Sequence, residues 1–191
     1  MDTPVLVITG PSGVGKGTLI RRLLEAVPGS ELSVSATTRS PRDGEVNGRD
    51  YHFLSTDEFV QRVADGEFVE HAEYAGNHYG TLRSELQRPA TLIVLEIDLQ
   101  GARQVRETMP EAERVFIAPP RYDVDELERR LVGRGAENPE QIARRLAVAR
   151  DEIAARHEFD RRIVNDDVDT AARELIEIAA TMCDPQVRTD T

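Results

Sequence analysis

Apolar residues occur along the chain in short unbroken runs that alternate with helical stripes. Four runs are rich in Val, Ile and Leu and predict buried β-strands at 5–9, 91–98, 114–118 and 161–165. Between and after them, apolar residues three and four apart predict helices over 16–27, 100–108, 123–134, from 139 to beyond 153, and over 169–182. Because strands alternate with helices, the pattern predicts an α/β fold with a parallel sheet that helices cover on both faces.

The stretch 30–81 has a different texture. Repeated glycines and Pro41 separate short strand-like pieces such as 51–54 and 68–70. This pattern predicts a small, mostly antiparallel insertion with one helix at about 57–64, capped by Ser55 or Thr56. No repeat or long linker divides the chain, so residues 1–191 are expected to form a single domain.

Amino-acid composition and net charge indicate a globular protein and limit its possible partners. The chain has 191 residues, of which 39% are hydrophobic and 31% charged, as in an ordinary globular protein, and its formal net charge is −11. This acidity argues against nucleic acid or an anionic membrane as partner, so any phosphate site must be a local island of positive charge. With a single cysteine, Cys183, no signal-peptide pattern and no membrane-spanning apolar run, we expect a cytoplasmic protein.

The motif GPSGVGKGT at 10–18 lies between the first strand and the first helix. The spacing of Gly10, Gly15 and Lys16 matches a P-loop, in which glycines let backbone N–H groups surround phosphate and the lysine adds a full charge. A glycine-rich turn without a ligand is the alternative, but the lysine in register favours the phosphate loop. The residues expected to bind ATP here are Gly10, Pro11, Ser12, Gly13, Val14, Gly15, Lys16, Gly17 and Thr18.

Gly17 departs from the usual P-loop, which has Ser or Thr directly after the lysine to hold Mg²⁺. Here the hydroxyl comes one residue later, at Thr18. Loops that read Lys-Gly-Thr resemble those of nucleoside monophosphate kinases such as adenylate kinase. The loop therefore favours a small kinase that uses ATP with Mg²⁺ as cofactor, with the metal held by Thr18 or through water.

A kinase also needs an anionic acceptor site, and 33–53 supplies candidates. Arg39 and Arg42 lie three residues apart in a hydroxyl-rich segment, their planar forks suit phosphate, and Tyr51 could donate a phenolic O–H. From composition alone, solvent-exposed arginines would be the simpler interpretation. The segment nevertheless closely resembles the GMP-binding region of guanylate kinases. Further stretches agree with that family in order and spacing over about 4–180: GEFVEHAEYAGNHYGT (66–81), LEIDLQG (95–101), RLVGRG (130–135) and IVNDD (163–167).

The resemblance implies a P-loop NTPase-type sheet with a mixed, β-rich GMP-binding insertion and a helical lid. The implied divisions are a core at about 1–32, 82–124 and 160–185, a GMP-binding region at about 33–81 and a lid at about 125–159. It implies that the γ-phosphate of ATP passes to GMP; whether dGMP is also accepted is not given by the sequence. The implied GMP-binding residues are Ser35, Arg39, Arg42, Tyr51, Glu70, Tyr79, Thr81, Glu96 and Asp98, and those at the donor are the lid residues Arg130, Arg134 and Arg145, with Asn165 near adenine.

Chemistry supports Glu70 as the group that reads the base. A carboxylate can accept both N1–H and N2–H of guanine, whereas adenine presents an acceptor there. The residues alone do not select Glu70 over Glu67 or Glu73, and the lid arginines could equally be surface side chains. The four histidines show no metal-ligand spacing. Three alternatives remain: a kinase for another acceptor, a non-catalytic guanylate-kinase-like module that binds phosphopeptides, and an interaction protein that binds ATP without turnover.

Overall fold

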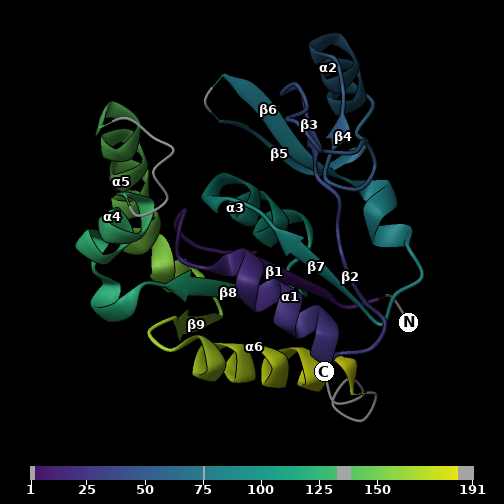
Figure 1. Ribbon diagram of the computed structural model, residues 1–191. Coiled ribbons are helices and arrows are strands. Elements are labelled where there is room, and N and C mark those ends of the chain that lie inside the picture. The colour runs from purple at the N-terminus through teal and green to yellow at the C-terminus, as the bar shows by residue number, and fades with distance from the viewer. Residues whose placement is uncertain (1–2, 75, 133–138, 185–191) are drawn as a thin grey trace.

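A parallel sheet of five strands forms the centre of the molecule (Figure 1). The computed structural model describes residues 3–74, 76–132 and 139–184. The strand order is β2-β7-β1-β8-β9, and every pairing is parallel. The strands are β1 (Val5–Thr9), β2 (Ser30–Leu32), β7 (Leu92–Glu96), β8 (Glu113–Ala118) and β9 (Arg161–Val164). The predicted α/β fold with a parallel sheet is confirmed.

Helices cover both faces of this sheet. In Figure 1, α1 (Lys16–Ala26) and α6 (Val168–Cys183) lie side by side on one face, and α3 (Leu99–Thr108) lies on the other. All five residues of β1 are buried, because the central strand of a doubly covered sheet faces apolar side chains on both sides. From α1, the buried side chains are Leu19, Ile20 and Leu23, spaced as one helical stripe requires.

Two strand predictions differ from the structure. The strand predicted over 91–98 ends at Glu96, because Asp98 leaves the sheet and accepts a hydrogen bond of 2.8 Å from Gly101 N–H as the N-cap of α3. Strand β2 was not predicted as a strand. Its sequence Ser-Glu-Leu has little apolar signal, since β2 is a half-buried edge strand that pairs with β7 alone.

A second, smaller sheet is built from the insertion. Its order is β4-β3-β6-β5, with β5–β6 and β3–β6 antiparallel and β3–β4 parallel, so the predicted mixed, mostly antiparallel character is confirmed. Its helix α2 (Thr56–Ala64) begins after Ser55, which forms a capping box with Glu58. The strands are β3 (Ala36–Thr37), β4 (His52–Phe53), β5 (Phe68–Tyr74) and β6 (Asn77–Leu82).

The remaining elements connect the two sheets and border them. The 3₁₀ segment η1 (Arg83–Gln87) leads from β6 back towards β7, and η2 (Pro120–Tyr122) and η3 (Ala155–Glu158) flank the helices α4 (Val124–Val132) and α5 (Pro139–Ala154). In Figure 1, α4 and α5 stand at the opposite end of the molecule from α2. Asn138 directly precedes α5 and is a residue type favoured at the helix N-cap, but it lies outside the described residues. Among the helices described, none is long and apolar enough to cross a membrane.

Candidate active site

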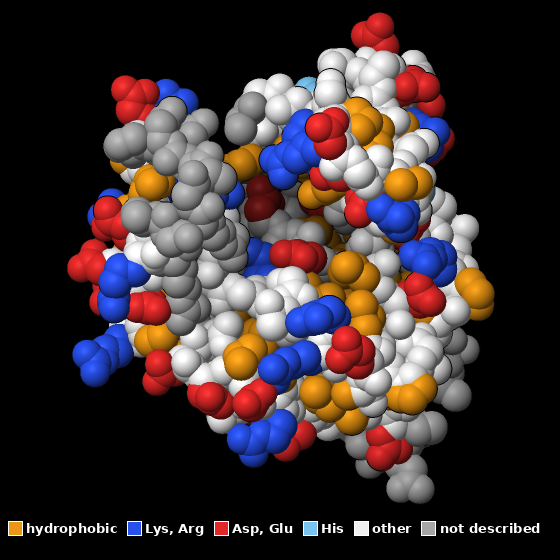
Figure 2. Space-filling model, in the orientation of Figure 1, with side chains coloured by type: hydrophobic (Ala, Val, Ile, Leu, Met, Phe, Trp, Pro, Cys, Tyr) orange, Lys and Arg blue, Asp and Glu red, His pale blue; other side chains and the backbone are white. Residues whose placement is uncertain are grey.

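A cavity of about 410 Å³ opens where the carboxyl ends of the core strands meet the smaller sheet and α5. Figure 2 shows it as a recess between the smaller sheet and the part of the molecule that carries α4 and α5. Ligands of parallel α/β sheets bind at this edge, outside the carboxyl ends of the strands. The cavity brings together ten of the predicted site residues: Gly10, Ser12, Lys16, Ser35, Tyr51, Glu70, Tyr79, Glu96, Asp98 and Arg145.

The predicted phosphate loop joins β1 to α1, and its glycines 10, 13 and 15 all have a positive φ. Gly10 has φ 150°, and a Cβ there would lie 2.2 Å from the Ile117 carbonyl oxygen; Gly15 has φ 104°. Lys16 Nζ donates to the Gly10 carbonyl at 2.6 Å and lies 3.9 Å from Glu96 Oε1. Lys16 is also the only lysine of the chain, since 23 of its 24 basic residues are arginine. One ammonium group therefore sits at the start of α1, facing the cavity.

Asn165 contacts this loop through a hydrogen bond to its backbone. It is buried directly after β9, and its Nδ2 donates to the Val14 carbonyl at 2.8 Å. A Cβ on Gly15 would lie 2.5 Å from the same nitrogen, so the side chain packs tightly against the loop. Asn165 does not line the cavity, and its placement near adenine stays a prediction. Gly17 and Thr18 are exposed in the first turn of α1.

Glu70 lines the cavity from the smaller sheet, on β5. It is only 4% exposed, and it accepts a hydrogen bond of 2.7 Å from Thr81 Oγ1 on β6. The register of β5 against β6 shifts between Phe68 and Glu70, and such a bulge re-aims side chains. Burial raises the pKa of the Glu70 carboxyl to about 7; the Thr81 hydrogen bond opposes this rise and the nearby Asp98 adds to it. Thr81 does not line the cavity, but its hydrogen bond orients the Glu70 carboxylate that does.

The two predicted phosphate arginines lie beside the cavity and do not line it. The Arg39 guanidinium pairs with Glu45 at 2.9 Å and lies 5.2 Å from the centroid of the Tyr51 ring. Glu45 also accepts the Arg42 N–H at 2.7 Å, which shapes the loop that carries both arginines, and the Arg42 side chain is exposed. Tyr51 packs edge-on against Tyr79, with ring centroids 6.2 Å apart. Glu45 was not predicted as a partner of Arg39.

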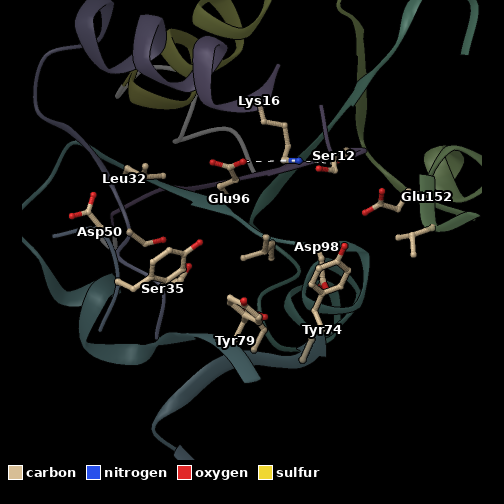
Figure 3. A pocket seen from close by; sticks show the side chains of 18 of the residues that line it. Ser12, Lys16, Leu32, Ser35, Asp50, Tyr74, Tyr79, Glu96, Asp98 and Glu152 are labelled. Atoms are coloured by element: carbon tan, nitrogen blue, oxygen red, sulfur yellow. Dashed lines mark hydrogen bonds and ion pairs between the residues drawn. The ribbon is translucent and has the colours of Figure 1, made fainter. Parts of the chain in front are cut away.

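The three arginines predicted to belong to a lid are only partly described. Arg145 on α5 lines the cavity, Arg130 belongs to α4 without a described side chain, and Arg134 lies outside the described residues. Sequence reasoning missed Glu152, which Figure 3 shows in the pocket on the side of Ser12 and Asp98. Burial raises its pKa to about 7, against the effect of the Lys16 charge. Its position two helical turns after Arg145 could have revealed it, because residues seven apart share a helix face.

Other lining residues were missed because they carry little chemical signal on their own. Ala72 and Tyr74 follow Glu70 at the strand period of two, which places them on the same face of β5. The full set of unpredicted lining residues is Leu32, Ser33, Asp50, Ala72, Tyr74, Gly80, Ile97, Val148 and Glu152.

The cavity offers oxygen ligands beside Lys16, the donors that Mg²⁺ prefers. Glu96 and Asp98 both line it, at the carboxyl end of β7. Within the described ranges, no group of three His, Cys, Asp or Glu side chains could hold a metal ion together. Two carboxylates are enough for a Mg²⁺ ion whose other ligands are water and the phosphates of a bound nucleotide.

Comparison with known proteins agrees with this geometry. The sequence model of the family described as guanylate kinase matches residues 2–181. The chain is 54% identical over 178 residues to a guanylate kinase of Trichormus variabilis, covering 92% of this chain and 88% of that protein. It is 55% identical over 175 residues to a guanylate kinase of Frankia casuarinae, covering 90% of this chain and 94% of that protein.

A solved structure has a similar overall fold. The crystal structure of guanylate kinase from Anaplasma phagocytophilum superposes with a TM-score of 0.75 at 32% identity, covering 98% of this chain and 89% of that one. A match to the family model over most of the chain, together with relatives above half identity, shows the family. The chain therefore belongs to the guanylate kinase family.

Proposed function

We propose that this chain transfers the γ-phosphate of ATP to GMP and releases ADP and GDP. The observation that carries the proposal is that one cavity is lined both by Lys16, in the predicted P-loop, and by the buried Glu70, whose carboxylate accepts a hydrogen bond from Thr81. The first is suited to a nucleotide polyphosphate and the second to the edge of guanine. The family match and the relatives above half identity support the same activity.

Guanine selection follows from the position of Glu70. In its ionised form, its carboxylate can accept N1–H and N2–H of guanine, with Thr81 holding one carboxylate oxygen. Ser35 lines the same cavity and offers a hydroxyl to the base. Adenine would place its N1 acceptor against the carboxylate and leave a buried charge without a donor, which is strongly unfavourable.

Phosphoryl transfer needs positioning and charge neutralisation more than covalent chemistry. A phosphate oxygen of GMP attacks the γ-phosphorus of ATP in line. The new P–O bond forms as the bond to the β–γ bridging oxygen breaks, and that electron pair leaves with ADP. Lys16 and the loop N–H groups stabilise charge on the donor, Arg39 and Arg42 orient the GMP phosphate, and Tyr51 and Tyr79 assist them.

The lid completes the donor site in this proposal. Arg130, Arg134 and Arg145 close over the donor phosphates and exclude water, which would otherwise hydrolyse ATP. The division into core, GMP-binding region and lid follows the ranges given from the sequence, with α4 and α5 forming the lid. We assign the reaction to purine nucleotide metabolism in the cytoplasm, which a chain with a single cysteine fits.

Mg²⁺ is expected to arrive with ATP. Glu96 and Asp98 are the residues that would hold it, directly or through water, with Thr18 as the loop hydroxyl nearest in sequence to the usual ligand. When bound, the metal would neutralise charge on the phosphates being transferred. All other charge stabilisation in the proposal comes from the side chains and backbone of this chain.

The experiment that tests the activity measures ADP release from MgATP with GMP, AMP, CMP and UMP in turn. GMP-dependent ADP formation, with the other three near background, supports the proposal. A protein that binds GMP but is silent with all four acceptors would instead be a binding module. Turnover with AMP equal to that with GMP would contradict the role of Glu70.

The single lysine allows a second, independent test. An amine-selective reagent should modify Lys16 and abolish activity, and saturating ATP should protect it while GMP alone protects less. The α-amino group is the matched internal control, because it reacts with the same reagent outside the cavity. Loss of activity upon labelling of the α-amino group alone would contradict the placement of Lys16 at the donor phosphates.

A further inference from the structure

We propose that α3 sets the position of the guanine-reading carboxylate, with Gly101 and Gln104 as the positioning residues for Glu70. This inference rests on the proposed function, because it assigns the residues that hold its base-reading group in place. Both residues belong to a helix of the core, whereas Glu70 belongs to β5 of the smaller sheet. Neither residue touches the cavity itself.

Gly101 makes room for the carboxylate. A Cβ at this position would lie 2.4 Å from Glu70 Oε2, closer than real Cβ contacts allow, and 3.0 Å from Glu70 Cδ, tighter than most such contacts. The backbone of Gly101 is ordinary helix, so its lack of a side chain is required by Glu70 and not by a special dihedral angle. Any larger residue at 101 must push the carboxylate away from α3, and therefore away from its place beside Thr81.

Gln104 holds the adjacent backbone from the same helix face. Its Oε1 accepts the His71 N–H at 3.1 Å, and its Nε2 donates to the His71 carbonyl at 2.7 Å. One amide thus satisfies both backbone groups of the residue that follows Glu70, as a neighbouring strand would. This pair of bonds fixes the distance between α3 and β5 at the point where the base is read.

The helix also ties the base-reading end of the cavity to the phosphate end. Asp98 lines the cavity and lies between the end of β7 and the start of α3. Its carboxylate caps α3 by accepting a hydrogen bond of 2.8 Å from the Gly101 N–H. β7 pairs with β1, which leads into the phosphate loop. A rigid path of β1, β7, Asp98 and α3 therefore sets where Glu70 stands relative to Lys16, and the reacting phosphates must meet between them.

The first experiment compares Gly101→Ala and Gln104→Ala with the unsubstituted enzyme. We expect the KM for GMP to rise about tenfold or more in Gly101→Ala and about threefold in Gln104→Ala, because misplaced base-reading groups weaken binding. The KM for ATP should stay within about twofold, since the phosphate loop is untouched. Arg103→Ala is the matched control on the same helix, because its guanidinium pairs with Glu158 at 2.8 and 2.6 Å and not with β5.

A double-substitution cycle separates positioning from a general structural effect. In a Glu70→Ala background, the space beside residue 101 is free, so adding Gly101→Ala should change GMP binding less than about twofold. Alanine has a higher helix propensity than glycine, so Gly101→Ala should not destabilise α3. We therefore expect the thermal unfolding temperature of this variant not to fall through an effect on the helix. Direct calorimetric binding of GMP gives the same readout without turnover.

The outcomes are distinct. An enzyme without GMP-dependent turnover or GMP binding would overturn the proposed function. An active enzyme whose Gly101→Ala and Gln104→Ala variants keep the normal KM for GMP would overturn the role of α3 alone. Equal losses of GMP affinity from Gly101→Ala in the unsubstituted protein and in the Glu70→Ala background would likewise overturn it, because the contact with the carboxylate would then not matter.

Discussion

Ionisation of Glu70 is expected to control the affinity for GMP near neutral pH. The carboxyl is buried, and burial raises its pKa to about 7 in the protein without nucleotide. Only the ionised form can accept both N1–H and N2–H of guanine, so the protonated form is not competent to bind the base in this way. GMP binding should therefore weaken as pH falls through 7.

The size of the effect follows from the competent fraction. With a pKa of about 7, about nine tenths of Glu70 is ionised at pH 8 and about one tenth at pH 6. The apparent dissociation constant varies as the inverse of this fraction, so it should rise about tenfold between pH 8 and pH 6. Bound guanine favours the charged carboxylate, so the pKa of Glu70 should fall in the complex.

The assay is calorimetric titration of the protein with GMP at half-unit steps between pH 5.5 and 8.5. The GMP phosphate itself titrates with a pKa of about 6, so the wild-type curve alone contains two contributions. Glu70→Gln provides the control, because it keeps the phosphate contribution and removes that of the carboxyl. Thr81→Val should move the midpoint to higher pH, since the Thr81 hydrogen bond lowers the pKa of Glu70.

Two results would refute the reasoning. One is GMP affinity that does not change between pH 6 and 8 beyond the change seen in Glu70→Gln. The other is a Thr81→Val variant whose midpoint stays at the wild-type pH, because the hydroxyl would then not stabilise the ionised carboxylate.

Three further predictions concern the donor end. Lys16→Ala should lower kcat/KM at least about a hundredfold without unfolding the protein, and near-normal turnover would remove its role. Glu152 has a pKa raised from 4.5 to about 7, so its stabilising contribution is complete below pH 4.5 and lost as pH rises through 7. Glu152→Gln should therefore raise the free energy of unfolding at pH 8 by at most about 3 kcal/mol and change it little at pH 5, measured by urea denaturation. Asn165→Ala removes the hydrogen bond from Asn165 Nδ2 to the Val14 carbonyl and should cost about 1–3 kcal/mol in stability and raise the KM for ATP; a rise confined to GMP would contradict this.

The core of the fold could be predicted because its signal is local. Buried strands such as β1 and β8 are unbroken apolar runs, and each is followed by turn residues and an amphipathic helix. β2 carries no such run, since it is an edge strand of three half-buried residues that pairs with β7 alone, and Leu32 is its one apolar side chain packed against the core. Its place in the sheet is therefore a tertiary property that the sequence pattern does not contain.

The sequence alone predicted those site residues that belong to a contiguous motif with a recognisable chemical role. The residues of the predicted P-loop are contiguous, so their spacing alone singles out Lys16, and Lys16 lines the cavity. Glu70 has no such local signature, and only the resemblance to a family selected it over Glu67 and Glu73. The structure supplies the physical distinction: Glu70 is 4% exposed and bonded to Thr81, whereas Glu67 and Glu73 are exposed.

Contacts across elements account for what the sequence did not reveal. Glu45 binds Arg39 only because the loop after β3 folds back on itself, and Gly101 matters only because β5 packs against α3. Glu152 is the intermediate case. Helical period relates it to Arg145, but its burial depends on how α5 lies over the cavity. Sequence periodicity predicts local secondary structure, but it does not predict contacts between elements that are distant in the sequence.

The charges of the cavity lead to a last prediction, which concerns both substrates at once. Of the described residues that line it, five are acidic (Asp50, Glu70, Glu96, Asp98 and Glu152) and two are basic (Lys16 and Arg145). Phosphate binding must therefore overcome repulsion near Lys16, whose charge acts on Glu152, and Glu152 gains a proton near pH 7. As pH falls from 8 to 6, protonation of Glu152 should tighten ATP binding while protonation of Glu70 weakens GMP binding. Opposite slopes for the two nucleotides, with the ATP slope reduced in Glu152→Gln, would show that the two buried acids act at separate ends of one site; parallel slopes would contradict that separation.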